Sequence, residues 1–234
     1  MKNETTSENK GVLFAPIVVC AGAFLLYLLA QLIGGVVAAL VTPRELNETY
    51  QLFIAVACNV LALFGLVSFT VKRLHFSVRH IGLTLPRAKD VLMVLPAFVA
   101  YFIFSALVTS LVAVFFKSFN SDQVQNVGFE NLQGFGLLTA GFISLVILTP
   151  IFEEIIFRGY LFKGLRVRLP FWVSAVITSI IFAAAHWQWN VSLDVFGLSL
   201  VLCFLTEKSK SLGPAMALHA LKNSLAFILL FVHK

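Results

Sequence analysis

The sequence feature that most constrains the fold is a succession of apolar runs, most of them long enough to cross a lipid bilayer as a helix. A hydrocarbon core about 30 Å thick requires about 20 apolar residues in helical form. By that measure there are seven candidate spans, at residues 12–41, 52–71, 91–116, 137–165, 171–191, 193–206 and 213–232. The runs predict an all-α, polytopic membrane bundle of about seven transmembrane helices, because helices satisfy their backbone hydrogen bonds within lipid.

The charge content favours the same class of protein. Only 12% of the residues are charged and 59% are hydrophobic, whereas an average soluble domain carries about 25% charged residues. The net charge of +6 arises from basic residues in short loops between the apolar runs, a distribution that orients membrane proteins. We therefore expect the lipid bilayer as a partner and no nucleic acid.

The distribution of Lys and Arg also predicts the orientation. If the N-terminus is cytoplasmic, twelve of the 17 Lys and Arg residues fall in cytoplasmic segments and three in outside segments, while Arg158 and Lys222 lie within helices. This bias predicts a cytoplasmic tail at residues 1–11 and a basic cytoplasmic loop at residues 72–90. Compactness and the lack of eukaryotic targeting signals favour a bacterial plasma membrane.

Two adjacent carboxylates and an arginine interrupt the fourth apolar run. Each ionised group there would cost roughly 2.5 to 3.5 kcal/mol on insertion scales. On a helix, Glu154 and Arg158 are four residues apart and are expected to form an ion pair, whereas Glu153 points about 100° away and has no local partner. Glu153 is therefore the candidate functional group, with Glu154 and Arg158 in a supporting role.

Further polar residues stand out in the later spans. His219 and Asn223 are four residues apart, so both project from one helical face, and His186 lies in an earlier run. At 1.5 Å per residue, their depths along the helices allow them to meet Glu153 in one pocket that opens toward the cytoplasm. Lys222, without an obvious neighbour of opposite charge, is expected to snorkel or to pair locally.

These residues resemble a known family. The three motifs of the CPBP intramembrane endopeptidases, formerly called the ABI family, are matched in order by Glu153-Glu154-x-x-x-Arg158, Phe182-x-x-x-His186 and His219-x-x-x-Asn223. The family includes the CAAX prenyl endopeptidase and proteins of bacteriocin processing or immunity. The resemblance makes residues 137–234, with spans four to seven, the catalytic core, and it leaves the three spans within residues 12–136 without a matching motif.

The resemblance implies a membrane protease that hydrolyses a peptide bond in a membrane-associated peptide or protein. Such a substrate is a lipidated CAAX-like peptide, a leader peptide, a pheromone or a bacteriocin precursor. By resemblance to the family, Glu153 and His186 are expected to activate a water, and His219 and Asn223 to line the oxyanion hole. Arg158 is expected to hold Glu154 in place through the ion pair. This is a glutamate-type reaction without a cofactor.

Three alternatives remain open. Glu153, His186 and His219 are a valid catalytic zinc set, although no His-Glu-x-x-His sequence is present and Asn is an unusual zinc ligand. A second alternative is a non-catalytic immunity or scaffold protein of the same family. A transporter is less favoured, because no internal repeat of the kind that transporters show is visible.

Overall fold

The computed structural model describes residues 47–72, 77–116 and 132–232, together with the single positions 22, 25, 32, 36, 40 and 127. The expected cytoplasmic tail at 1–11 and most of the first expected span at 12–41 lie outside the described residues. Within the described ranges the chain forms helices and connecting turns, with no β-strand.

The helical segments follow one another closely along the chain. They are α2 (Asn47–Lys72), α3 (Ala88–Leu92), α4 (Val94–Phe115), α5 (Phe135–Phe142), η2 (Ile143–Leu148), α6 (Thr149–Glu154), η3 (Ile155–Phe162), α7 (Lys163–Arg166), α8 (Phe171–Ala184), α9 (Trp189–Ser209), α10 (Gly213–Phe227) and η4 (Ile228–Val232), where η marks π-helix.

Five helices in the described ranges are long and apolar enough to cross a membrane. They are Thr49–Ser68, Ala88–Phe115, Phe135–Arg166, Trp189–Ser209 and Gly213–Val232. Several of these helices carry apolar side chains on exposed faces, as lipid-facing helices do. The prediction of an all-helical, polytopic integral membrane protein is confirmed, whereas the number seven stays a prediction.

The boundary expected between the fifth and sixth spans is wrong. α8 ends at Ala184, and its 14 residues reach only about 21 Å, less than the hydrocarbon thickness of about 30 Å. α9 begins at Trp189 and is the longer helix. The turn between them contains Trp187 with φ of 55°. The turn contains neither glycine nor proline, so hydropathy alone did not predict the break between the two helices.

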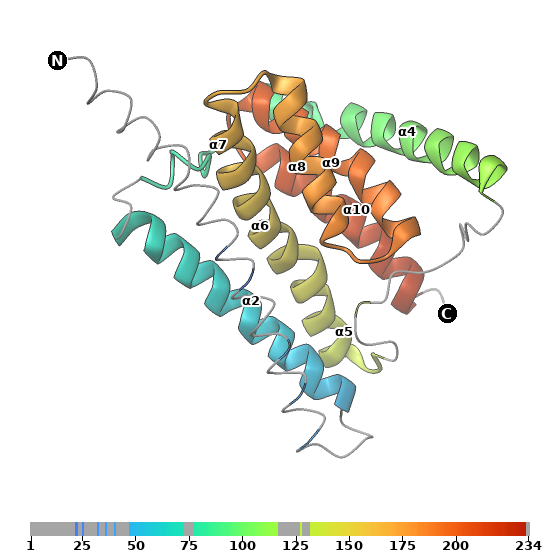
Figure 1. The fold of residues 1–234 in the computed structure, drawn as a ribbon. Coiled ribbons are helices and arrows are strands. Elements are labelled where there is room, and N and C mark those ends of the chain that lie inside the picture. Colours follow the sequence, from blue (N-terminus) through green and yellow to red (C-terminus); the bar gives the residue numbers. More distant parts are fainter. Residues whose placement is uncertain are drawn as a thin grey trace.

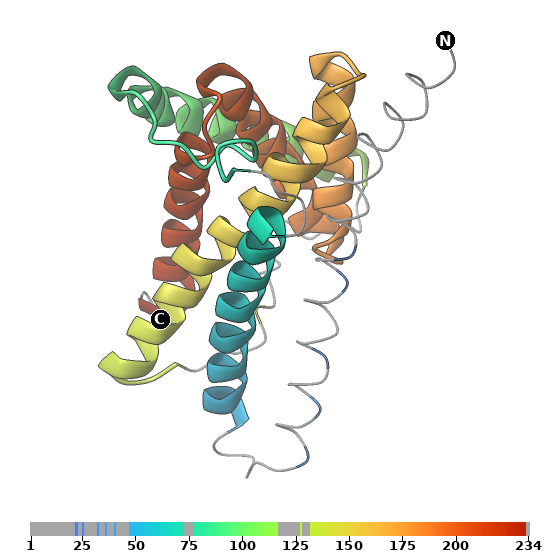
Figure 2. The same ribbon diagram turned by 90° about the vertical axis from the view of Figure 1, so that its left-hand side faces the viewer.

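The helix that runs from α5 to α7 is central to the arrangement. Figure 1 shows it crossing the molecule between α2 on one side and α8, α9 and α10 on the other. α9 contacts both α8 and α4, and α10 contacts α4, α6 and η2 (Figure 2). The largest cluster of buried side chains, which includes Phe152, Ile156 and Phe182, lies where α6 and η3 meet α8.

Two π-helical segments flank α6 within this central helix. η2 ends directly before α6, whose second residue is Pro150, and η3 begins directly after Glu154. Proline lacks an amide hydrogen and cannot make the regular helical bond, and π-helical segments are frequent at functional sites. The Glu153 and Glu154 pair therefore occupies a short α-helical step between two wider turns.

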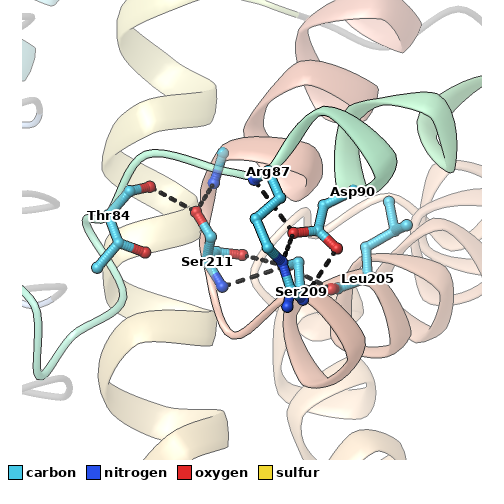
Figure 3. A network of polar contacts seen from close by, with 7 residues as sticks. Thr84, Arg87, Asp90, Leu205, Ser209 and Ser211 are labelled. Atoms are coloured by element: carbon cyan, nitrogen blue, oxygen red, sulfur yellow. Dashed lines mark hydrogen bonds and ion pairs between the residues drawn. The ribbon is translucent and has the colours of Figure 1, made fainter.

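The segment before α3 is tied to the turn between α9 and α10 (Figure 3). The Ser211 hydroxyl donates to the Thr84 carbonyl at 2.6 Å, and the Leu212 amide donates to the Gly82 carbonyl at 2.8 Å. Gly82 has φ of +90°, a conformation that L-residues rarely adopt, and Gly159 lets the Ile81 carbonyl approach η3 closely. These contacts fix the end of the bundle where α10 begins.

Candidate active site

A cavity of about 410 Å³ lies between α4, the central helix, α9 and α10. The four residues expected to be catalytic all line it, although they come from three separate parts of the chain. The polar and charged lining residues are Ser105, Thr109, Thr149, Glu153, His186, Asn190, Asp194, His219, Lys222 and Asn223. Apolar side chains of α9, α10 and η4 form much of the remaining wall.

Glu154 lies beside the cavity, fully buried, between two nitrogen donors. Its Oε1 accepts from Arg158 Nη1 at 2.8 Å and lies 2.9 Å from His219 Nδ1. Glu154 and Arg158 have no exposed surface, so the expected ion pair is present and excluded from solvent. A buried pair of this kind contributes mainly when both partners stay, because loss of one leaves an uncompensated charge. Glu154 therefore links Arg158 to the orientation of His219.

His219 is contacted by both glutamates. Its Nε2 lies 3.6 Å from Glu153 Oε2, opposite the nitrogen that faces Glu154. In a neutral imidazole one nitrogen carries the hydrogen and the other a lone pair. With Nδ1–H donating to Glu154, attraction at Nε2 requires a proton shared with Glu153 or a doubly protonated ring. His219 thus lies between the two glutamates, with one ring nitrogen toward each.

His186 lies in the turn after α8, two residues beyond the end of the helix. Its Nδ1 lies 2.8 Å from the Phe182 carbonyl, which can only accept a hydrogen bond, so Nδ1 is the donor. In the neutral ring this leaves the Nε2 lone pair as an acceptor. The half-buried ring is therefore oriented by the backbone of its own helix.

Phe182 separates the charged groups beneath the cavity. Its fully buried ring lies 4.5 Å from the Arg158 guanidinium carbon, 4.9 Å from the His186 ring and 5.9 Å from the His219 ring. A cation over an aromatic face is attracted to it, more strongly where water is excluded. The phenylalanine of the second motif thus supports Arg158 and both histidines together.

Asn223 lines the cavity one turn beyond His219 on α10. Its Nδ2 donates to the Leu145 carbonyl in η2 at 2.9 Å. The side-chain amide has two hydrogens on that nitrogen, so this bond orients the group and leaves a second donor. Both third-motif residues are therefore held in place by groups on the central helix.

Two charged residues of the cavity were not recognised as a pair from the sequence. Asp194 on α9 accepts from Tyr101 at 2.6 Å and from Ser105, both on α4, and its Oδ2 lies 3.7 Å from Lys222 Nζ. The expectation that Lys222 snorkels or pairs locally is wrong, since its partner is 28 residues away on another helix. An aspartate inside an apolar helix is itself a functional signal, and that signal was available.

The donor geometry does not assemble a metal site in the part of the chain that the structure describes. There, no three His, Cys, Asp or Glu side chains are grouped so that they could hold a metal ion. Glu153 and His219 lie together, but the Nδ1 nitrogens of His186 and His219 face a carbonyl and Glu154.

Comparison with known proteins finds a family match over the segment that supplies most of the cavity lining. Residues 135–225 match the family model described as "Type II CAAX prenyl endopeptidase Rce1-like". The match contains Glu153, His186, His219 and Asn223, and it begins where α5 begins. CAAX prenyl endopeptidases are proteases, so the family to which this segment is similar is one of peptide-bond hydrolases.

Two curated proteins are similar over shorter stretches. The UPF0177 protein YaiF of Lactococcus lactis subsp. lactis (strain IL1403) is 30% identical over 110 residues, which cover 46% of this chain and 49% of the relative. An uncharacterized 24.3 kDa protein of Escherichia coli is 39% identical over 61 residues, which cover 25% of this chain and 28% of that protein. The chain thus spans half or less of these relatives. No solved structure gives a significant match.

Proposed function

We propose that this chain is an intramembrane endopeptidase that uses a glutamate-activated water, on the premise that its residues 135–225 are similar to the Rce1-like type II CAAX prenyl endopeptidases. The catalytic core is residues 137–234, and the substrate is a membrane-associated peptide or protein. CAAX-like peptides, leader peptides, pheromones and bacteriocin precursors all fit this class.

The observation that supports this function most strongly is the position of Glu153. It lines the cavity, lies 3.6 Å from His219 Nε2, and is one residue from the buried Glu154 and Arg158 pair. A cavity carboxylate beside a histidine can take a proton from water and later return it, and hydrolysis requires both steps. The Glu154 and Arg158 ion pair beneath it takes no direct part in hydrolysis and holds the His219 ring in position.

In the proposed first step, Glu153 removes a proton from a water whose second contact is the Nε2 lone pair of His186. The water oxygen forms a bond to the carbonyl carbon, and the carbonyl electron pair moves to oxygen. In this mechanism an Nε2–H of His219 and the remaining Asn223 N–H donate to that oxyanion. Preorganised donors at such a position are worth about 2.7 to 4 kcal/mol each in other hydrolases.

In the second step, the protonated Glu153 gives its proton to the nitrogen of the scissile bond. The carbon to nitrogen bond breaks and the oxyanion electrons restore the carbonyl. One water is consumed, and a new carboxylic acid and a new amine leave, so the groups of the protein end in their starting states; the acid loses its proton to solvent after release. No metal or cofactor takes part.

The proposed location follows from the loop charges. The N-terminus and the loop at 72–90 lie in the cytoplasm of a bacterial cell, and the cavity opens toward that side of the plasma membrane. The four proposed catalytic residues then meet substrates made in the cytoplasm and anchored at the inner leaflet.

The test is a cleavage screen with the detergent-purified full chain. Quenched fluorescent peptides that include a farnesylated CAAX peptide and unmodified leader-type peptides are incubated with wild type and with Glu153→Gln, and mass spectrometry locates the cut bond. The expected result is cleavage of at least one class at a single bond by wild type and none by Glu153→Gln. The matched control is Glu207→Gln, which removes a carboxylate that pairs with Arg166 and does not line the cavity.

The outcomes separate the remaining alternatives. Equal cleavage by wild type and Glu153→Gln contradicts the glutamate mechanism. A folded wild type that binds peptides and cuts none supports the non-catalytic immunity or scaffold alternative. Glu153-dependent ion or solute flux into proteoliposomes, without cleavage, supports the transporter.

A further inference from the structure

A second charged pair lies on the wall of the cavity and has no part in the proposed hydrolysis. Asp194 on α9 and Lys222 on α10 both line the cavity, with 28% and 14% of their side-chain surface exposed. An ionisable pair inside membrane-spanning helices is costly, and such residues usually mark a binding site or pathway. The Asp194 and Lys222 pair is therefore a candidate binding group for a ligand in the cavity.

The two members of the pair are held very differently. Asp194 Oδ1 accepts from the hydroxyls of Tyr101 and Ser105 on α4, and these bonds fix the carboxylate. Tyr101 is buried, so this anchor is sheltered from solvent. Asp194 is consequently a rigid group that ties α9 to α4.

Lys222 is held loosely by comparison. Its Nζ lies 3.7 Å from Asp194 Oδ2, which is beyond ordinary hydrogen-bond distance. An ammonium group has three N–H donors. Among the described residues no hydrogen bond occupies any of them, so the group has donors to offer to a ligand in the cavity.

The position of Lys222 relates it to the proposed reaction centre. On α10 it is three residues after His219, so these two side chains lie on one helical face, and all three of Lys222, His219 and Asn223 line the cavity. Three residues of helix rise about 4.5 Å, and an extended peptide advances about 3.3 to 3.6 Å per residue. The rise corresponds to little more than one residue of extended peptide, and the lysine side chain extends the reach, so an anion bound by Lys222 lies within a few residues of the bond under attack.

The apolar cavity wall next to Lys222 indicates which chemical group lies beside the bound anion. Beyond Lys222, the cavity is lined by apolar side chains that include Ala226, Phe227, Leu229 and Leu230. A cation beside an apolar wall fits a carboxylate carried on a residue with an apolar side chain. The C-terminal residue of a peptide has this combination, and a C-terminal CAAX sequence ends in a free carboxylate.

We infer that Lys222 is a specificity residue that binds the C-terminal carboxylate of the substrate peptide, with Asp194 holding the ammonium in position when the cavity is empty. Substrate binding exchanges the long contact with Asp194 for a shorter one with the peptide. The inference rests on the proposed function, because it assigns an end of the peptide to the same cavity. It predicts cleavage within a few residues of a free C-terminus.

The experiment compares two peptides of one sequence, one with a free C-terminal carboxylate and one with a C-terminal amide. Wild type is expected to cut the free acid about tenfold more efficiently, with the difference in KM, since charge-assisted hydrogen bonds to a carboxylate are strong. Lys222→Met is expected to cut both peptides equally, at the efficiency of wild type on the amide. Lys222→Arg keeps the charge and is expected to retain a preference for the acid.

Asp194→Asn is the second variant and guards against a merely structural explanation. Asparagine still accepts from Tyr101 and Ser105, but it no longer competes for the ammonium. The preference for the acid is therefore expected to stay or to increase. If Lys222 serves only to join α9 to α10, both Lys222→Met and Asp194→Asn lower cleavage of acid and amide alike and leave their ratio unchanged, which overturns the inference.

A binding measurement keeps this result separate from the proposed function. Fluorescently labelled acid and amide peptides are titrated with Glu153→Gln protein, which is not expected to consume them. Tighter binding of the acid that disappears with an added Lys222→Met change supports the inference even where no peptide is cut. If wild type cuts both peptides without preference, the inference is overturned and the proposed function stays intact. If the two peptides bind equally and neither is cut, the inference is overturned as well.

Discussion

Nδ1 of His219 lies 2.9 Å from Oε1 of Glu154, the same oxygen that accepts from Arg158 Nη1 at 2.8 Å. One carboxylate oxygen therefore joins the first motif to the third. The opposite nitrogen of the ring faces Glu153 at 3.6 Å. The two adjacent glutamates thus have different positions, with one buried beneath His219 and the other in the cavity.

Removal of the Glu154 charge tests the buried link. Glu154→Gln is expected to destabilise the protein by about 3 to 5 kcal/mol, because the Arg158 guanidinium stays buried without its carboxylate. The measurement is thermal unfolding of the purified protein in one detergent. Glu154→Leu combined with Arg158→Met removes both charges and is expected to unfold at a higher temperature than Glu154→Gln, yet to stay inactive because His219 loses its acceptor. Wild-type stability of Glu154→Gln would contradict the buried ion pair.

His186 is expected to affect catalysis more than stability. The half-buried ring lies in a turn, so His186→Gln should leave the unfolding temperature nearly unchanged while it lowers the cleavage rate about 10²- to 10⁴-fold, the range of general acid–base contributions. The readout is kcat on the best peptide of the screen. His80→Gln, an exposed histidine before α3, is the control and should keep full activity. A rate for His186→Gln within a few-fold of wild type would remove His186 from the proposed mechanism.

The contact between the segment before α3 and the turn after α9 gives a prediction for stability. Gly82→Ala forces an L-residue to φ of +90° and brings its Cβ toward Lys163, and strained backbone conformations of this kind cost about 1 to 3 kcal/mol. Gly65→Ala is the control, because Gly65 lies within α2 with open space around it and should gain about 0.5 to 1 kcal/mol. Thermal unfolding and limited proteolysis near residues 77–87 give the readout. Equal effects of the two changes would contradict the tight turn at Gly82.

The proposed orientation is tested by labelling single cysteines in intact cells. In a background without Cys20, Cys58 and Cys203, a membrane-impermeant maleimide should label Gln133→Cys in intact cells and Arg79→Cys only after the membrane is opened. Both positions are exposed, so access to the reagent depends on the side of the membrane. Labelling of Arg79→Cys in intact cells would reverse the orientation.

Much of the fold was predictable from hydropathy, since lipid requires long apolar helices wherever the chain crosses it. The ion pair of Glu154 with Arg158 followed from helical spacing alone. The turn at Trp187 was missed, because its left-handed residue is neither glycine nor proline. Spacing also could not show that His219 faces Glu154 or that Asp194 faces Lys222, since those contacts depend on how separate helices pack.

The central claim is that Glu153 activates water without a metal, and a rate measurement with chelated protein tests it most directly. Single-turnover cleavage of the best peptide is measured for wild type and Glu153→Gln, each treated with a strong chelator and dialysed, with and without added zinc. The account predicts an unchanged rate for chelated wild type and a loss of at least about 10³-fold for Glu153→Gln under every condition. Loss of wild-type activity on chelation, with recovery by zinc alone, would contradict the metal-free mechanism, and cleavage by Glu153→Gln at the wild-type rate would contradict the role of Glu153.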